Sequence, residues 1–138
     1  MGTTSDINVL TRDIIGAHIE VHRELGPKLL ESIYATCVHR ELQARGLHFE
    51  RERPIPIVYK GDTLPSFYRI DLIVEGLIVV ELKAVTTLVS EHEAQLFNYM
   101  RIARQPVGYL INFGTKDELQ WKRFVLTGRL ISDKGTEH

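Results

Sequence analysis

The sequence predicts a single α/β (α+β) domain in which helices flank a mixed β-sheet. The chain has 138 residues, a length at which one domain buries roughly 68% of its unfolded surface. Its 43% hydrophobic and 25% charged residues are ordinary for a soluble globular protein. Helical and strand periodicities follow one another in the order α-α-β-β-β-α-β-β, which indicates helices packed on a mixed sheet.

Two helices are expected first. Apolar residues recur at helical spacing from about Thr11 to Leu25, and Gly26-Pro27 ends that helix. A second helix runs from about Leu30 to Arg45, and Gly46 follows it at the position that favours a left-handed cap. Residues 1–10 are mainly polar, so we expect a flexible N-terminus there.

Three strands follow as a meander, at Phe49–Tyr59, Leu64–Val74 and Leu77–Val85. Pro54 and Pro56 cannot donate ladder hydrogen bonds, so the first of these strands is expected at an edge of the sheet. Alternation places six aliphatic residues of the other two strands on one face: Ile70, Leu72, Val74, Ile78, Val80 and Leu82.

A third helix and two more strands complete the expected fold. The helix runs from Ser90 to about Arg104 and opens with a capping box, in which Ser90 and Glu93 satisfy each other's backbone donors. Val107–Phe113 is typical of a buried strand, and Trp121–Leu126 is expected to be the last strand.

Composition limits the domain organisation and the location. We expect one domain over residues 11–131 and a polar tail over residues 132–138. A formal net charge of −1 gives no global attraction to nucleic acid. The single Cys37 excludes an internal disulfide and suits a reducing cytoplasm. No signal peptide or membrane-crossing apolar run is visible, so a cytoplasmic protein without a membrane partner is expected.

The strongest functional signal lies between Arg69 and Lys83, in two apolar strands joined at Glu75-Gly76. Asp71, Glu81 and Lys83 gather at the end of this hairpin that is distant from the turn. Buried carboxylates need a compensating partner. A divalent cation between the two acids, with Lys83 beside it, is the sharpest candidate; separate surface salt bridges are the alternative.

The length of the hairpin loop decides whether the two acids share a face of the sheet. They do so only if the loop has an odd number of residues. We predict a three-residue loop over residues 74–76, which pairs Ile73 with Leu77. Asp71 then lies opposite Val79, one alternate position from Glu81. A two-residue Glu75-Gly76 loop, the alternative, would place the acids on opposite faces.

Six sequence blocks follow one another along the chain: V-H-R-E-L-G-P (Val21–Pro27), L-E-S-I-Y (Leu30–Tyr34), R-I-D-L-I-V (Arg69–Val74), V-E-L-K-A-V (Val80–Val85), H-E-A-Q-L-F-N-Y (His92–Tyr99) and L-I-N-F-G (Leu110–Gly114). In this order they resemble the PD-(D/E)xK nuclease superfamily and, more closely, the bacterial GxxExxY protein family. The resemblance implies a restriction-endonuclease-like αβββαβ core with an extra N-terminal helix. Lys28 replaces the glycine that names the family, which leaves the turn conformation open, and no proline directly precedes Asp71.

The resemblance also implies a metal site. Asp71 and Glu81 would bind Mg²⁺ (or Mn²⁺), together with the carbonyl of Leu82, because hard oxygen ligands suit these ions. Lys83 would orient a water nucleophile and offset charge that develops on the phosphate. Glu31 would complete an acid triad from its helix; a helix N-terminal charge without such a role is the alternative.

Further candidates lie on the helices and beside the hairpin. Gln95 and Tyr99 share a helical face and resemble the Gln-x-x-x-Tyr element of RecB-like nucleases, in which the glutamine sits beside the active site. Tyr99 as a core residue is the alternative. Tyr99, Tyr34, His22 and Arg69 are candidate substrate-binding residues.

Other polar and aromatic residues have plainer interpretations. His18 and His22 are one helical turn apart, but no third ligand supports a zinc site. His92 is interpreted as packing or facing phosphate. Four basic residues could form a phosphate-binding rim or be scattered surface charge: Arg101, Arg104, Lys122 and Arg123. Three aromatic residues are expected in the core: Tyr109, Trp121 and Phe124.

Together these features predict a Mg²⁺-dependent nuclease that acts on DNA or RNA. One alternative is a catalytically silent nuclease-fold module that binds nucleic acid or regulates a partner, which the near-neutral charge favours. Another is a hydrolase of small phosphorylated substrates. The joint presence of Asp71, Glu81, Lys83 and Gln95 favours the nuclease. A homodimer through the proline-containing edge strand is a further expectation.

Overall fold

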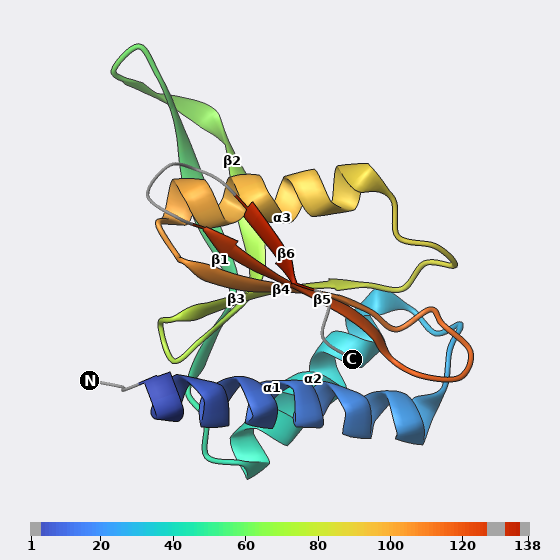
Figure 1. Ribbon diagram of the computed structural model, residues 1–138. Helices are drawn as coiled ribbons and strands as arrows, with labels where there is room; N and C mark the ends of the chain where they lie inside the picture. Colours follow the sequence, from blue (N-terminus) through green and yellow to red (C-terminus); the bar gives the residue numbers. More distant parts are fainter. Residues whose placement is uncertain (1–3, 127–131, 136–138) are drawn as a thin grey trace.

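The computed structural model describes residues 4–126 and 132–135, which form one six-stranded sheet with helices on both faces (Figure 1). Helices α1 (Thr4–Leu25) and α2 (Glu31–Ala44) pack on one face, and α3 (Ser90–Ala103) packs on the other. The strands follow chain order across the sheet: β1 (Phe49–Tyr59), β2 (Asp62–Val74), β3 (Ile78–Lys83), β4 (Val107–Asn112), β5 (Gln120–Leu126) and β6 (Ser132–Gly135). This confirms the predicted fold class.

The central strands β3 and β4 are parallel, and every other neighbouring pair is antiparallel. Parallel neighbours need a crossover connection, and α3 provides it. The carboxyl ends of β3 and β4 therefore meet at one edge, where Lys83 pairs with Asn112. The proline-containing strand β1 is at the edge of the sheet, as predicted.

Two apolar layers bury both faces of the central strands. Val80 lies in the layer beneath α1 and α2, together with Tyr34 and Phe113. Its neighbour Val79 lies in the layer beneath α3, with Leu96. A strand that is buried on both faces carries an almost continuous apolar run, which explains the sequence of β3.

Strand β2 changes face at Asp71, so the prediction for Ile70 is wrong. Ile70 packs in the layer beneath α3, whereas Leu72 packs beneath α1 and α2. The β1–β2 ladder pairs Arg51 with Leu72 and Arg53 with Ile70, but omits the residues between them. The omitted residue on β1, Glu52, has φ +52°, and this local irregularity breaks the alternation of side chains.

Both predicted termini also need correction. Helix α1 begins at Thr4, within the segment expected to be flexible, because Leu10 packs against the core and the Thr11 hydroxyl donates to the Asn8 carbonyl. Residues 132–135, expected to belong to a tail, form β6 because the edge of β5 is available for pairing. The rest of that tail, residues 136–138, and the domain end at 127–131 lie outside the described residues.

The start of α3 differs from the predicted capping box. Val89 occupies the N-cap position, and its N–H donates to Nδ1 of His92 (3.0 Å). Ser90 is already the first helical residue, and Glu93 is bound by Lys122. His92 is therefore a capping residue, which replaces its expected packing or phosphate-facing role. Among the described helices, none combines the length and the apolar character needed to span a membrane.

Candidate active site

The hairpin between β2 and β3 has an odd loop length, and continuation of its register sets Asp71 opposite Glu81. Its loop is residues 75–77, and Ile73 pairs with Val79 rather than with Leu77. The predicted loop, 74–76, is therefore wrong by one residue. Glu75 and Gly76 both take a left-handed conformation, with φ +53° at Glu75. The carboxylate of Glu75 accepts the backbone N–H of His48. This contact accounts for the position of the loop one residue beyond the predicted one.

Asp71 and Glu81 meet where β2 and β3 separate. The ladder between these strands ends at Leu72–Val80. Beyond it, Oε1 of Glu81 accepts the N–H of Asp71 (2.9 Å), and Oδ2 of Asp71 accepts the N–H of Leu82 (3.0 Å). Each carboxylate thus binds the backbone across from it, and the two side chains lie together.

Burial makes this pair of carboxylates electrostatically unfavourable when both are ionised. The side chain of Glu81 is almost inaccessible, with 3% of the residue exposed. This burial, followed by repulsion from Asp71, raises the pKa of Glu81 to about 8. Burial also raises the pKa of Asp71; the Leu82 N–H and Lys83 oppose that shift, and Glu31 adds to it. A proton or a cation is needed to compensate such a pair.

Helix α3 brings two polar side chains to the same place. Oε1 of Gln95 accepts a hydrogen bond from the ammonium of Lys83 (3.1 Å). Tyr99 lies one turn further along α3 and is buried. Burial and the carboxylates of Glu81 and Asp71 raise the pKa of Tyr99, and a hydrogen bond with Gln95 opposes this shift. The structure therefore connects Lys83, Gln95 and Tyr99 in one polar contact chain.

A pocket of about 280 Å³ opens beside Asp71 on the α2 side of the sheet. Its lining is Glu31, Ser32, Ala35, His39, Glu52, Asp71 and Leu82. Glu31, at the first turn of α2, therefore faces the space next to Asp71. Sequence analysis missed Glu52 and His39, because a charged residue on an edge strand and a histidine within a helix carry no distinguishing pattern.

Two of the candidate substrate-binding residues, Tyr34 and His22, form hydrogen bonds within the framework. The hydroxyl of Tyr34 donates to the carbonyl of Gly26 and accepts the N–H of Leu29 (3.2 Å), which fixes the turn between α1 and α2. The ring of His22 is hydrogen-bonded to the carbonyl of Thr115 (2.8 Å). Neither side chain lines the pocket beside Asp71.

Arg69, the exposed candidate beside the hairpin, contacts a residue that lines the pocket next to Asp71. Its guanidinium lies 4.0 Å from the carboxylate of Glu52, one of the lining residues, and 5.8 Å from the centre of the Phe67 ring. Arg69 is exposed, so its free N–H groups are accessible to a ligand.

A clamp at the end of β4 fixes the segment that follows Lys83. The side-chain carbonyl of Asn112 accepts the N–H groups of Val85 and Gly114, and its amide donates to the carbonyl of Val85. A Cβ on Gly114 would lie 2.0 Å from the carbonyl oxygen of Val85, so this close approach requires glycine. The clamp lies in the matched block L-I-N-F-G, for which no role was predicted.

The oxygen donors around Asp71 suit a hard divalent cation. Mg²⁺ is commonly bound by one or two carboxylates and several waters, and the Asp71–Glu81 pair meets that requirement. Within residues 4–126 and 132–135, no three His, Cys, Asp or Glu side chains form a ready metal-binding group. His18, which is fully buried, bonds to the Ile14 carbonyl, and burial lowers its pKa to about 4; this fits a core histidine.

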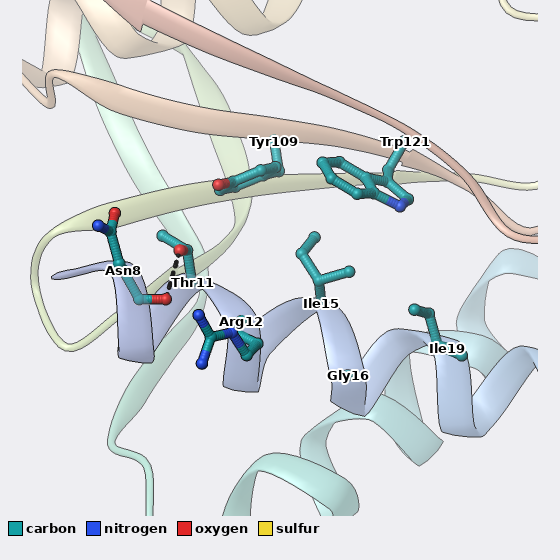
Figure 2. A pocket seen from close by; sticks show the side chains of 8 residues that line it. All are labelled: Asn8, Thr11, Arg12, Ile15, Gly16, Ile19, Tyr109 and Trp121. Carbon is teal, nitrogen blue, oxygen red and sulfur yellow. Dashed lines mark hydrogen bonds between the residues drawn. The ribbon is translucent and has the colours of Figure 1, made fainter. Parts of the chain in front are cut away.

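A larger pocket of about 440 Å³ lies between α1 and the sheet, apart from the acids (Figure 2). Asn8, Thr11 and Arg12 lie toward one end, and Ile15 and Ile19 lie below Tyr109 and Trp121. Tyr109 and Phe124 are buried, as expected for core residues, whereas Trp121 is half-buried. None of the candidate catalytic residues lines this pocket.

The basic residues expected near the site are partly engaged elsewhere. Lys122 pairs with Glu93, and Arg101 donates to the side chain of Asn98 (3.1 Å). Arg104 takes the left-handed position at the end of α3. These contacts favour the interpretation as dispersed surface charge over that of a continuous phosphate-binding rim.

Comparison with known proteins agrees with this geometry. A family model for the PD-(D/E)XK nuclease superfamily matches residues 8–124. The crystal structure of SSO0001 is similar, with a TM-score of 0.54 and 21% identity over 67% of this chain. The match covers 48% of SSO0001, so the chain spans about half of its length, and this likeness shows a shared fold. The search of curated proteins gave no match. Because the family model spans nearly all of the sheet and its helices, the chain belongs to the PD-(D/E)XK nuclease superfamily.

Proposed function

We propose that the protein is a Mg²⁺-dependent nuclease that hydrolyses phosphodiester bonds in DNA or RNA. The observation that carries this proposal is the pairing of half-buried Asp71 with buried Glu81, with the Lys83–Gln95 contact at the same strand end. Membership of a nuclease superfamily supports the reaction class. The absence of excess positive charge does not oppose it, because a metal ion would supply the local positive charge.

The proposed ion is held by oxygen ligands alone. Asp71 and Glu81 would be the main ligands, the Leu82 carbonyl an additional one, and Glu31 would approach across the pocket. Bound Mg²⁺, or Mn²⁺ in its place, would polarise the phosphate and activate water. Burial, followed by repulsion from Asp71, raises the pKa of Glu81 to about 8, and a bound ion would favour the ionised carboxylate.

Lys83 is proposed to stabilise negative charge that develops on the phosphate in the transition state. Its ammonium has three donors, and one of them is directed to Gln95 (3.1 Å). Gln95 therefore acts as a positioning residue, because it fixes the direction of the Lys83 side chain. The remaining donors can serve substrate oxygen atoms and the attacking water.

We also propose the narrower assignment to the GxxExxY group. Lys28 has φ +75°, a conformation that glycine adopts without strain, which fits the glycine of the family motif. Glu31 lines the pocket beside Asp71, and Tyr34 fixes the turn that precedes it. The three motif positions thus have a common purpose, which is to place Glu31.

The test is a cleavage assay on labelled single- and double-stranded DNA and RNA with Mg²⁺ or Mn²⁺. Asp71→Asn, Glu81→Gln and Lys83→Ala are each expected to lower the rate at least 100-fold, since each removes a ligand or a charge stabiliser. Asp117→Asn, at an exposed acid outside the site, is the matched control and should retain the rate. Equal cleavage by Asp71→Asn and the unsubstituted protein would overturn the proposal, as would the absence of cleavage with every substrate.

A second candidate is a binding or regulatory module with the same fold and no turnover. The net charge of −1 favours its regulatory form, because strong binding of phosphate backbones usually requires basic surface. Calorimetry with Mg²⁺ and Mn²⁺ separates the candidates when it is combined with the assay. Metal binding without hydrolysis of polynucleotides or of a small phosphodiester would favour the module, and hydrolysis of the small ester alone would favour a small-molecule hydrolase.

A further inference from the structure

The outer half of the β1–β2 hairpin, residues 53–69, forms an arm that the other described elements leave largely uncovered, and we call it the arm. The β2–β3 ladder ends at Leu72, whereas β1 and β2 remain paired as far as Tyr59 and Asp62. Figure 1 shows this hairpin projecting beyond α3 and the rest of the sheet. Between residues 53 and 69 only Ile55 is buried. The arm therefore contributes little to the core.

The arm nevertheless displays large aromatic side chains to solvent. Tyr59 is 60% exposed, Phe67 is 51% exposed and Tyr68 is 44% exposed. Exposed apolar surface on an element that is not part of the core often marks an interaction site in soluble proteins. A solvated hairpin with no partner would be expected to carry polar residues at these positions.

Two of the exposed rings are accompanied by cations. The ammonium of Lys60 lies 5.4 Å from the centre of the Tyr59 ring, and the guanidinium of Arg69 lies 5.8 Å from that of Phe67. An aromatic face with an adjacent positive charge is the combination that binds unpaired nucleotides, because the base stacks and the phosphate is neutralised. A duplex keeps its bases stacked on each other and does not offer them to such rings.

The base of the arm is continuous with the candidate active site. The Tyr68 ring packs against Tyr99, with ring centres 5.5 Å apart, and Tyr99 is hydrogen-bonded to Gln95. Arg69 contacts Glu52, which lines the pocket beside Asp71. A strand bound along the arm would therefore lead directly to the acids.

The sequence of the arm argues against a second copy of the chain as the occupant. Addition of a strand to a sheet edge needs backbone donors on that edge. Pro54 and Pro56 remove two N–H groups from β1, which is the open edge strand. A partner that stacks on side chains does not need these donors.

Building on the nuclease function proposed above, we propose that this arm binds a single polynucleotide strand and guides it to the acids. Its bases stack on Tyr59 and Phe67, and its phosphates contact the cations beside these rings, Lys60 and Arg69. The substrate class is thus single-stranded nucleic acid, or a duplex with an unpaired strand. Because Lys60 and Arg69 neutralise phosphates and so release counterions, the affinity is expected to fall as the salt concentration rises.

The experiment measures the binding of fluorescent 15-nucleotide oligothymidine and of a duplex of equal length, by anisotropy in EDTA. The double variant Tyr59→Ala/Phe67→Ala is expected to lose at least tenfold in single-strand affinity. Tyr59→Trp/Phe67→Trp should restore the affinity, because tryptophan also stacks. Val58→Ala, at a residue 61% exposed on the same strand, is the matched control and should bind normally.

Three outcomes would overturn the arm as a single-strand site. They are equal affinity of the double alanine variant and the unsubstituted protein, duplex binding as tight as single-strand binding, and absence of single-strand binding. A dimer that dissociates in the double variant, detected by sedimentation, would assign the rings to self-association and would also overturn it. Oligouridine in place of oligothymidine identifies the preferred sugar. Thermal melts monitored by circular dichroism verify that each variant is folded.

Failure of the nuclease function remains distinguishable from failure of this inference. Normal single-strand binding by the arm without any cleavage would remove the nuclease and keep the arm. Cleavage of single strands at an unchanged rate and KM in the double variant would keep the nuclease and remove the arm.

Discussion

Lys28 adopts φ +75°, a conformation that side-chain-bearing residues rarely take because Cβ approaches the backbone. The turn around it is fixed from both sides, since the hydroxyl of Tyr34 bonds to Gly26 and to Leu29. The backbone of Lys28 is therefore held in this conformation. The sequence left the conformation of this turn open, and the structure shows Lys28 in a left-handed conformation that glycine adopts without strain.

Replacement of Lys28 by glycine is expected to stabilise the protein. Relief of the left-handed strain contributes about 1–2 kcal/mol, and the greater freedom of glycine in the unfolded chain offsets about 0.5–1 kcal/mol of it. Urea denaturation should show a net gain of about 0.5–1 kcal/mol. Lys116→Gly, at an exposed position without positive φ, should give no gain. A loss of stability in Lys28→Gly would contradict this account.

The buried carboxyl of Glu81 predicts an unusual pH dependence for the metal-free protein. Its pKa is raised from 4.5 to about 8 in the folded state, chiefly by burial. Between these values the unfolded chain releases a proton that the folded protein retains, so stability falls as pH rises. The loss should be on the order of a few kcal/mol between pH 5 and pH 8.

Thermal melts in EDTA from pH 5 to pH 9 test this prediction. Glu81→Gln should flatten the profile, because the amide does not ionise, and should raise the melting temperature at pH 8. Saturating Mg²⁺ should stabilise the unsubstituted protein more at pH 8 than at pH 5, since protons compete with the ion. A profile that rises from pH 5 to pH 8 would show that Glu81 is ionised without a cation.

At the scale of elements, α3 positions the Lys83 ammonium through a single side chain. Gln95→Ala is expected to lower the rate of cleavage by about 10- to 100-fold, as loss of a supporting contact commonly does. Because Gln95 does not contact the acids directly, the affinity for Mg²⁺ measured by calorimetry should change little.

The control for this prediction is Gln43→Ala, an exposed glutamine on α2. Gln95→Glu provides a second measurement, since it keeps an acceptor for Lys83 and should recover part of the rate. An unchanged rate in Gln95→Ala would show that Lys83 does not depend on α3.

Local sequence patterns predicted most elements, but not the details that involve distant contacts. The apolar runs of β3 and β4 and the prolines of β1 were sufficient to place those strands. The hairpin loop was misplaced by one residue because left-handed Glu75 is held by His48, from another part of the chain. The cap of α3 was misassigned because Glu93 pairs with Lys122 on β5.

The same limit applies to the candidate site. The acids of the hairpin could be predicted because they interrupt a buried apolar pattern. Glu52 could not, because only the local break in the β1–β2 ladder turns this edge-strand residue toward Asp71 and the pocket. The strand β6 had no signal either, since an edge strand needs no buried face.

At the scale of the whole molecule, the core and the projecting arm are separable. Connecting Ile55 directly to Tyr68 through an Asn-Gly turn would remove residues 56–67 and retain the pair that these two residues form. Because the removed residues include no buried side chain, the free energy of unfolding should change by less than about 1 kcal/mol. Urea denaturation measures this change.

The shortened protein should also keep its affinity for Mg²⁺, because Asp71 and Glu81 lie on the retained sheet. An insertion of equal size and polar composition at the new turn is the matched control for chain length. Global unfolding of the shortened protein would show that the arm supports the core, contrary to its exposure.

Asp71 and Glu81 also hold β2 and β3 together where the strands diverge, since each carboxylate accepts a backbone N–H that lies beyond the end of the ladder. An alanine at either position would therefore remove a proposed metal ligand and also a contact that holds β2 and β3 together. We expect its loss of activity to exceed that of the asparagine or glutamine variant. Exchange for asparagine or glutamine preserves an acceptor and the spacing of the strands. The carboxylates proposed to be reactive are therefore also part of the scaffold that presents them, and the charge can be removed without removing the support.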